Sequence, residues 1–306
     1  MKIGHIPVLV REVLATLQPR AGGVYLDCTV GGGGHAEAIL EAAGPPCRVV
    51  GIDRDPEAIR VAAGRLGRFG DRVRLVREDF RELPRLVSEL RLEGLNGVLF
   101  DLGVSSLQIG DPSRGFSFSI EGPLDMRMDR ESGAPAAREL LHELSEERLA
   151  RIIREYGEER WARQIARWIV SARRQGSLET TRDLAAVVTR AIPRRFWPRR
   201  IHPATRTFQA IRIAVNQELD GLEEGLERAA GLLKPGGRIV VISFHSLEDR
   251  VVKHLFRRLA ARGAVPGVRI LTRRPVTPTA EETAQNPRAR SGKLRAAERR
   301  EMEGDV

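Results

Sequence analysis

The sequence contains few cysteines and no long apolar run. Its 306 residues include two cysteines, Cys28 and Cys47, and their separation does not match the spacing of metal ligands. We therefore expect a reducing compartment, buried thiols and no metal site. No stretch of about 18 apolar residues is present to cross a membrane. The N-terminus also lacks the charged segment and apolar core of a signal peptide, so we expect a cytoplasmic protein.

Lysine is scarce as well, although the chain is strongly basic. Only four of the 51 Lys and Arg residues are lysines. The 51 basic residues outnumber the 41 Asp and Glu residues and give a formal net charge of +10. A balance of this kind favours a polyanionic partner. Apolar residues make up 42% and charged residues 30% of the sequence, which is typical of a folded globular protein with a full core.

One stretch near the N-terminus has the pattern of a nucleotide-binding βαβ unit. A strand-like run, Val24–Asp27, leads into four glycines, Gly31–Gly34, and His35. A helix-like segment and a second apolar run follow, and the run ends at Asp53. Glycines allow a ligand to approach the backbone closely, and an acid about 20 residues beyond the loop can accept hydrogen bonds from ribose hydroxyls.

The glycine loop alone leaves the identity of the cofactor open. Gly31, Gly33 and Ala36 fit a relaxed dinucleotide fingerprint, which is compatible with a nicotinamide or flavin cofactor. Four consecutive glycines followed by His35 are more similar to the first motif of methyltransferases that use S-adenosylmethionine (SAM).

Acidic residues follow the next strands as well. After a helix predicted from Pro56 to about Leu66, strands predicted at residues 73–76 and 97–100 lead to Asp79-Phe80 and to Asp101. Ligands of doubly wound sheets bind at the carboxyl ends of the strands. Acids gathered there suit a cation with amino and hydroxyl donors, which favours SAM over a pyrophosphate. Asp79 and Phe80 can contact an adenine, although Phe80 as plain core packing is equally compatible with the pattern.

The alternation of strands and helices then stops for more than 100 residues. The next core strand is expected at Arg238–Ser243, and a structureless connection of that length is uncommon inside a compact domain. We therefore predict a Rossmann-like α/β domain, residues 1–108 and 208–306, interrupted by a helical domain, residues 109–207. Three helices are expected in the insert, at residues 145–155, 158–174 and 181–192. A single long helix is expected from Thr205 to Leu233, and the strand from Arg238 then completes the sheet.

The insert contains the best candidates for contact with nucleic acid. Arginines lie on both sides of Phe196 and Trp197 in the segment 194–200. This combination suits phosphate contact and base stacking on single strands. The alternative is a solvated loop that Phe196 and Trp197 anchor in the core. A second basic segment near the C-terminus, residues 288–300, either contacts phosphates or is simply solvated. His245 and Asp249 suggest acid–base work, but a structural histidine is the more common case.

Several motifs together resemble one family, ribosomal RNA small subunit methyltransferase H, also called MraW. The resemblance covers nearly the whole chain, and its most specific stretches begin at Gly122, His202 and Ser243. The matching segments are residues 31–35, 53–56, 101–106, 114–118, 122–129, 202–210, 243–250 and 286–291.

The resemblance implies a SAM-dependent enzyme that methylates N4 of a cytidine in the decoding region of 16S rRNA, within the small ribosomal subunit. It also implies a Rossmann-like catalytic domain with an inserted helical substrate domain. The family's cofactor contacts carry over to seven positions: Gly33, Gly34, His35, Asp53, Phe80, Asp101 and Gln108. Leu107 stands where the family pattern leads us to expect a proline.

Asp101 is our candidate catalytic residue, as an acceptor for the N–H groups of the target amine. The segment from Asp101 to Val104 lacks the aromatic that amino-methyltransferases often carry there. A stacking partner for the base must then come from Phe116, Phe118 or Trp197. Three other interpretations are a nicotinamide-dependent oxidoreductase, a non-catalytic ribosome-assembly factor and a methyltransferase that acts on another nucleic acid.

Overall fold

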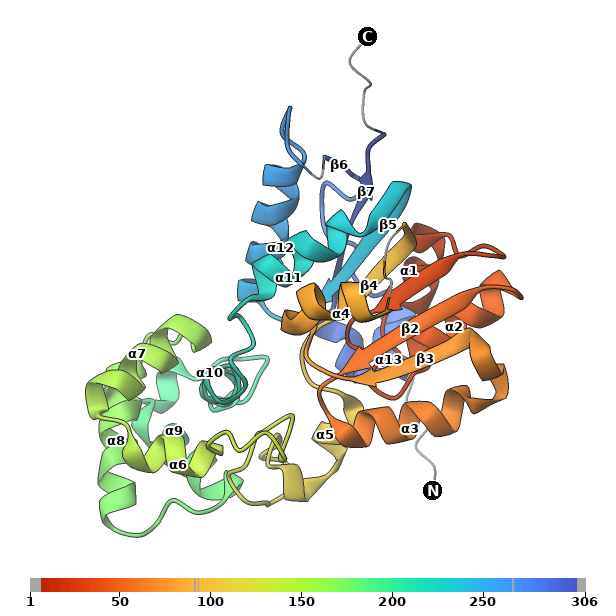
Figure 1. The fold of residues 1–306 in the computed structure, drawn as a ribbon. Coiled ribbons are helices and arrows are strands. Elements are labelled where there is room, and N and C mark those ends of the chain that lie inside the picture. Colours follow the sequence, from red (N-terminus) through yellow and green to blue (C-terminus); the bar gives the residue numbers. More distant parts are fainter. Residues whose placement is uncertain (1–6, 91, 93, 266, 302–306) are drawn as a thin grey trace. The chain divides into compact units, whose positions relative to one another are not determined.

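The computed structural model describes residues 7–90, 92, 94–265 and 267–301. The chain forms two compact units (Figure 1). Unit 1 comprises residues 1–103 and 219–306, and unit 2 comprises residues 104–218. Each unit has its own hydrophobic core. No helix among the described residues combines the length and the apolar character needed to cross a bilayer.

Unit 1 contains a seven-stranded sheet in the order β3-β2-β1-β4-β5-β7-β6. Neighbouring strands from β3 to β5 are parallel, and β7 runs antiparallel to both β5 and β6. The expected Rossmann-like α/β fold is thus confirmed. The strands are β1 Val24–Asp27, β2 Arg48–Asp53, β3 Val73–Arg77, β4 Leu95–Asp101, β5 Leu233–Ser243, β6 Val268–Ile270 and β7 Lys293–Arg299.

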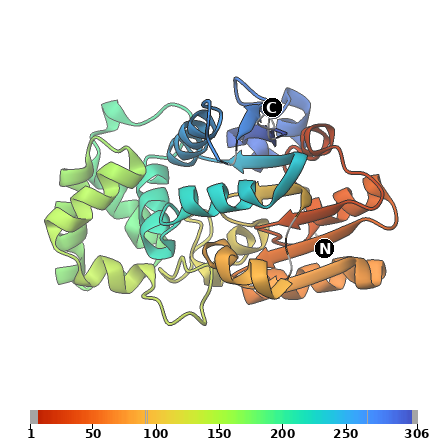
Figure 2. The same ribbon diagram turned by 45° about the horizontal axis from the view of Figure 1, so that its top comes forward.

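Helices cover both faces of this sheet (Figures 1 and 2). Alternate residues of a strand point to opposite faces, and Tyr25 accordingly joins one core while Leu26 joins the other. One face packs against α1 Val10–Leu17, α2 Gly34–Ala43 and α3 Pro56–Leu66, and the other against α4 Leu83–Leu90, α11 Leu222–Gly231 and α12 Ser246–Leu259. The short helix α13 spans Ala280–Gln285. Cys28 and Cys47 are buried free thiols, as expected.

Unit 2 is helical. Its helices are α5 Ser106–Gly110, α6 Ala137–Glu143, α7 Glu146–Gly157, α8 Ala162–Arg174, α9 Thr181–Ala191 and α10 Thr205–Asn216. Apolar residues three or four apart on α7, α8 and α9, such as Leu149 and Ile153, meet in one buried cluster. Short 3-10 segments elsewhere in the chain span Gly67–Arg72, Phe80–Glu82, Pro112–Arg114, Arg194–Phe196 and Pro287–Ser291.

The single long helix expected from Thr205 to Leu233 is wrong. Helix α10 ends at Asn216, because Gln217 and Gly221 both adopt left-handed backbone angles, and α11 starts only at Leu222. Helix α10 packs against α7 in unit 2. The limits of unit 2, residues 104 and 218, therefore differ from the expected insert of residues 109–207.

The sheet also extends further than expected. The strand before His245 is the last one predicted from the sequence, whereas β7 and β6 add two strands beyond β5. Strand β7 has the sequence Lys-Leu-Arg-Ala-Ala-Glu-Arg. Four consecutive residues of it are buried, although its four charged residues are not typical of a buried strand. Antiparallel pairing with two neighbours buries this strand in spite of its composition.

Close packing at Gly97 gives a test of this core. A Cβ at Gly97 in β4 would lie 2.6 Å from Leu17 Cδ1 and 2.9 Å from Tyr25 Cδ1. We expect Gly97→Ala to lower the free energy of unfolding by about 1–3 kcal/mol through overpacking. Gly64→Ala is the matched control, because nothing lies within 4 Å of a Cβ at this helical position; it should raise stability by about 0.5–1 kcal/mol. Urea unfolding of both variants measures the difference, and equal effects would contradict the packing.

Candidate functional site

The glycine loop joins β1 to α2 and is held by backbone contacts. Gly31 and Gly33 have positive φ angles of 51° and 80°, where a side chain would be strained. Gly31 N donates to Asp53 Oδ2 at 2.8 Å, and Gly33 N donates to the carbonyl of Val30 at 2.8 Å. Helix α2 begins at Gly34, so His35 lies in its first turn.

Three carboxylates end three adjacent parallel strands next to this loop. Asp27, Asp101 and Asp53 are the last residues of β1, β4 and β2. The hydroxyl of Thr29 accepts a hydrogen bond from Asp101 N at 2.6 Å, and Asp27 Oδ1 accepts one from Thr29 N at 3.2 Å. Backbone amides of the loop thus bond to the carboxylates of Asp27 and Asp53, and the Thr29 hydroxyl holds the backbone of Asp101.

His35 and two of the acids form a buried polar cluster. His35 Nε2 lies 3.4 Å from Asp101 Oδ2, a distance within ion-pair range but without the alignment of a hydrogen bond. Asp27 is 1% exposed. Among the described residues, the buried atoms Asp27 Oδ2 and Asp101 Oδ1 have no hydrogen-bond partner. Buried oxygens of this kind leave acceptor capacity for a ligand.

Burial sets the direction of the pKa shift for Asp27 and Asp53, but not for His35. It raises the pKa of Asp27 to about 7, against the opposing charge of His35, and the pKa of Asp53 to about 6, against hydrogen bonds from two backbone amides. For His35, burial works against the charged form, but Asp101 and then Asp27 outweigh it, so the pKa of the imidazole is raised. The site is therefore electrostatically poised to accept positive charge.

Asp79 and Phe80 lie beyond the next strand of the sheet and have protein partners. Arg81 donates from Nε and a terminal nitrogen to Asp79 at 3.0 and 2.9 Å, and Arg54 donates at 3.3 Å. Burial alone would raise the pKa of Asp79, but these arginines lower it. The ring of Phe80 packs edge-on against Phe100 with centroids 5.7 Å apart. Asp79 thus has its charge neutralised within the protein.

Gln108, the seventh predicted cofactor contact, belongs to unit 2. It is 4% exposed, and its Oε1 accepts a hydrogen bond from Ser105 N at 2.9 Å in a capping box that begins α5. Leu107 lies in the first turn of the same helix. The other six predicted positions lie in unit 1, at the glycine loop, the ends of β2 and β4, and the segment after β3.

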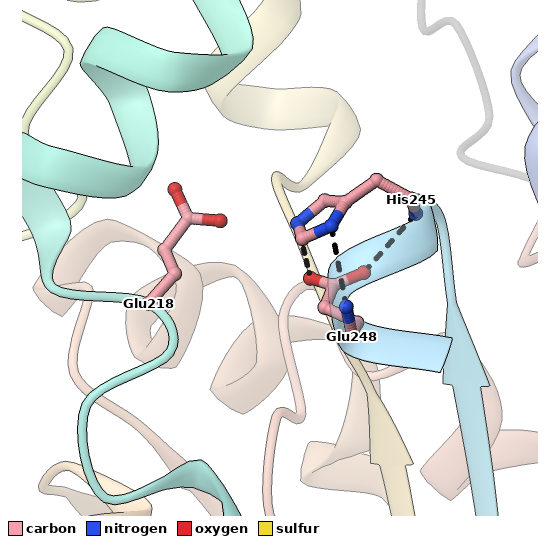
Figure 3. A group of neighbouring side chains, drawn as sticks. All are labelled: Glu218, His245 and Glu248. Carbon is pink, nitrogen blue, oxygen red and sulfur yellow. Dashed lines mark hydrogen bonds and ion pairs between the residues drawn. The ribbon is translucent and has the colours of Figure 1, made fainter. Parts of the chain in front are cut away.

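His245 caps a helix rather than pairing with Asp249. Figure 3 shows its ring beside Glu248: Nδ1 accepts from Glu248 N at 3.3 Å, and Nε2 lies 3.2 Å from Glu248 Oε1. The contacts of His245 are therefore those of a structural residue and not of an acid–base pair with Asp249. Asp249 pairs with Arg295, whose Nε donates at 2.6 Å. Glu218, also drawn in Figure 3, belongs to unit 2, where it pairs with Arg212 at 2.8 Å.

Unit 2 carries an aromatic–arginine surface, which we define as Arg160, Trp161 and the segment 194–200. The guanidinium groups of Arg160 and Arg195 lie 4.4 and 4.8 Å from the centre of the Phe196 ring. Phe196 and Trp197 remain 39% and 37% exposed, although the Trp197 indole donates to the carbonyl of Ile192. The segment is therefore anchored at one point while both rings reach solvent.

The two other candidate stacking residues are partly buried against the core of unit 2. Phe118 lies between His202 and Phe208, with ring centroids 4.7 and 4.9 Å away. Phe116 packs against the same helical core. The loop of residues 122–129 is held by the side chain of Asn216, which forms hydrogen bonds of 2.7 Å with the backbone of Met126 and of Met128. Of the three candidates, Trp197 is the most accessible.

Asp27, Arg160 and Trp161 belong to these sites but are not among the residues predicted from the sequence. Asp27 was noted only as the end of a strand, although its position before the glycine loop repeats the pattern of Asp53 and Asp101. The adjacent pair Arg160-Trp161 has the same composition as the segment 194–200, which was the available signal. The C-terminal basic segment serves mostly internal contacts: Arg295 is 7% exposed, and Arg299 and Arg300 donate to backbone carbonyls.

Comparisons with known proteins agree on one family. The model of the MraW methylase family matches residues 2–300. A protein of Geobacter sulfurreducens, ribosomal RNA small subunit methyltransferase H, is 55% identical over 98% of this chain and 100% of its own. A protein of the same description from Pelobacter propionicus is 54% identical over 96% of this chain and 98% of its own.

The raised pKa of Asp27 predicts a pH-dependent stability. Folding favours the protonated acid. The ionisation of Asp27 therefore destabilises the fold increasingly as the pH rises from 3.8, the pKa of an unperturbed aspartate, to about 7, the pKa of Asp27 in the folded protein. Asp27→Asn removes this penalty, so its gain in unfolding free energy should be larger at pH 8 than at pH 5 by about 2.7 kcal/mol, because the penalty grows over the two pH units from 5 to about 7 at roughly 1.36 kcal/mol per unit. Urea titrations at both pH values measure it, with exposed Asp71→Asn as control. An equal gain at both pH values would exclude a titrating Asp27.

Proposed function

Because the chain belongs to the MraW methylase family, we propose that it is a cytoplasmic SAM-dependent methyltransferase that methylates N4 of a cytidine in the decoding region of 16S rRNA, within the small ribosomal subunit. The observation that carries the proposal is the gathering of Asp27, Asp53 and Asp101 around the glycine loop. A basic surface on unit 2 supplies the contact with RNA.

The residues at the loop fit SAM better than a dinucleotide. SAM has a sulfonium, an amino group and ribose hydroxyls, all of which favour carboxylate acceptors, whereas a pyrophosphate would be repelled by them. The buried oxygens Asp27 Oδ2 and Asp101 Oδ1 accept no hydrogen bond from the described residues, so each can accept one from a ligand. The residues proposed to hold the cofactor are Gly33, Gly34, His35, Asp53, Phe80, Asp101 and Gln108, and the structure adds Asp27.

Asp101 is the proposed catalytic residue. When bound, SAM supplies an activated methyl group on its sulfonium. The exocyclic amine of cytidine is a weak nucleophile because its lone pair is delocalised into the ring, so transfer depends on position and on hydrogen-bond acceptors. Asp101 ends β4 with Oδ1 free of partners in the described residues. Its carboxylate accepts an N–H of the amine and directs the lone pair towards the methyl group.

His35 and Asp27 position the Asp101 carboxylate. His35 Nε2 lies 3.4 Å from Asp101 Oδ2, so an imidazolium there keeps one oxygen occupied and leaves the other for the substrate. Asp27 favours the protonated form of His35. A strong general base is not required, because the methylated amine can lose its proton to solvent after transfer.

The aromatic–arginine surface of unit 2 is proposed to bind rRNA. Single-stranded RNA is held by cationic contacts to phosphates and by stacking of bases on aromatic rings. Phe196 and Trp197 are more than one-third exposed, and Arg160 and Arg195 flank the Phe196 ring. Trp197 is the proposed stacking partner for an unpaired base, since its side chain is 37% exposed whereas Phe118 is partly buried against His202 and Phe208.

Nucleoside mass spectrometry tests the reaction. Small-subunit particles lacking the modification, incubated with SAM and the protein, should gain N4-methylcytidine in 16S rRNA. Asp101→Asn should lower the rate at saturating SAM by at least about 100-fold, because one acceptor aimed at the reacting amine is lost; calorimetry should show SAM still bound by the other proposed contacts, with reduced affinity. Methylation at another atom would refute the N4 assignment, and full activity of the variant would remove Asp101 from catalysis. Stabilisation by NAD and not by SAM in thermal unfolding would favour an oxidoreductase.

Four arginines of the aromatic–arginine surface can be tested together. Replacing Arg194, Arg195, Arg199 and Arg200 with glutamine should weaken RNA binding and flatten the dependence of log K on log salt concentration, because fewer counterions are released. The matched control replaces four exposed arginines of α7 and α8, Arg148, Arg154, Arg163 and Arg174. Filter binding at salt concentrations from about 50 to 200 mM measures the salt dependence of both variants. Equal slopes for the two variants would exclude this surface.

A further inference from the structure

Unit 1 contains a cationic pocket far along the chain from the glycine loop. It has a volume of about 250 Å³ and lies between α12 and the residues of β6, β7 and the segment after β6. Four of its seven lining residues are basic: Lys253, Arg257, Arg273 and Arg295. None of the seven is acidic. The site proposed above for SAM, in contrast, is lined by carboxylates, so the two places select ligands of opposite charge.

Three of these cations differ from their neighbours in having no acidic partner. Within the described residues, the side chains of Lys253, Arg257 and Arg273 form no ion pair. Next to them in the sequence or sheet, Arg258 pairs with Glu223 and Glu227, and Arg269 pairs with Glu298 at 2.6 Å. Acids are therefore available on this part of unit 1, and they contact the cations outside the pocket.

The fourth cation gives the pocket a fixed wall. Arg295 is 7% exposed, and its guanidinium is held by Asp249 through bonds of 2.6 and 3.3 Å. Thr272 is fixed as well, because its hydroxyl oxygen accepts from Ala296 N at 2.9 Å. The hydroxyl proton of Thr272 then remains for donation to an acceptor. Lys253 and Arg257 are one turn apart on α12 and share a face of the helix.

Size and lining determine which anion fits. A volume of about 250 Å³ is below the range of roughly 300–1,000 Å³ typical of pockets for drug-sized ligands. Arginines, of which Arg295 is fixed by Asp249, and a hydroxyl donor suit the tetrahedral oxygens of a phosphate. Phe256 and Ile270 add an apolar side to the pocket, which suits the sugar carbons attached to a phosphodiester. A phosphate with part of its ribose is the ligand that these features fit.

We propose that this pocket binds a backbone phosphodiester of the RNA substrate and so gives unit 1 its own contact with RNA. The inference rests on the proposed function, because rRNA is the polyanion that the enzyme would hold. Contacts with a phosphate carry no sequence information but fix orientation and register. The pocket would therefore strengthen binding to any base sequence, and choice of the target cytidine would be made elsewhere.

A double substitution on α12 tests the pocket. Lys253→Gln with Arg257→Gln should weaken binding of a 16S rRNA fragment at low salt and reduce the slope of log K against log salt by about 1, the value for one lost phosphate contact. The control, Arg262→Gln with Arg274→Gln, removes the same charge from two exposed residues outside the pocket. Its slope should remain within about 0.3 of the unsubstituted protein. Thermal unfolding and SAM calorimetry verify that both variants are folded.

Three results would overturn the proposal. An unchanged slope in the double variant means that no phosphate contact is lost there. Equal reductions in variant and control mean that net charge alone is responsible. Saturable binding of inorganic phosphate or cytidine monophosphate at constant ionic strength, abolished in the double variant while RNA binding is unchanged, would indicate a small-molecule site. Failure of the proposed function is distinct, because the unsubstituted protein would then leave rRNA unmethylated in the mass-spectrometric assay.

Discussion

The burial of carboxylates at one edge of a parallel sheet is the constraint on which the candidate active site depends. Charged groups taken out of water are costly unless neighbouring donors or charges compensate. Two backbone amides bond to Asp53, while within the described part of the chain the Asp27 carboxylate accepts a single hydrogen bond and Asp101 relies on His35. Compensation is thus incomplete within the chain, and burial raises the pKa of Asp27 and Asp53. A cation completes the balance, and the proposed donor of the methyl group is a cation.

Arginine pairing similarly distinguishes arginines with structural contacts from those proposed to bind a ligand. Many arginines are neutralised by acids, such as Arg81 by Asp79 and Arg212 by Glu218. Others lie against aromatic rings, as Arg160 and Arg195 do at Phe196, or line the pocket beside α12, where Arg257 and Arg273 form no ion pair with any described residue. These unneutralised groups, rather than the net charge of +10 itself, identify where a polyanion is expected to bind.

Local signals were sufficient for much of the fold. Asp55, Pro56 and Glu57 form the cap, first position and first turn of α3, because these interactions lie within a few residues of one another. The same is true of the first four strands and of the helical segments after Ser145 and Thr180. Helix α10 was misjudged because apolar spacing continues through Gln217, whose left-handed conformation has no sequence signal comparable to a glycine or proline.

The amino-acid sequence by itself determined the βαβ pattern, the acids at the strand ends, the helical character of the insert and the family resemblance. These properties follow from residue spacing and from motifs that are continuous in the chain. Only the tertiary structure decided that Asp27 joins His35 and Asp101, that β7 is buried between two strands, and that Lys253, Arg257, Arg273 and Arg295 line one pocket. These contacts join residues distant in sequence, and their energies depend on burial and on the partners that packing brings together.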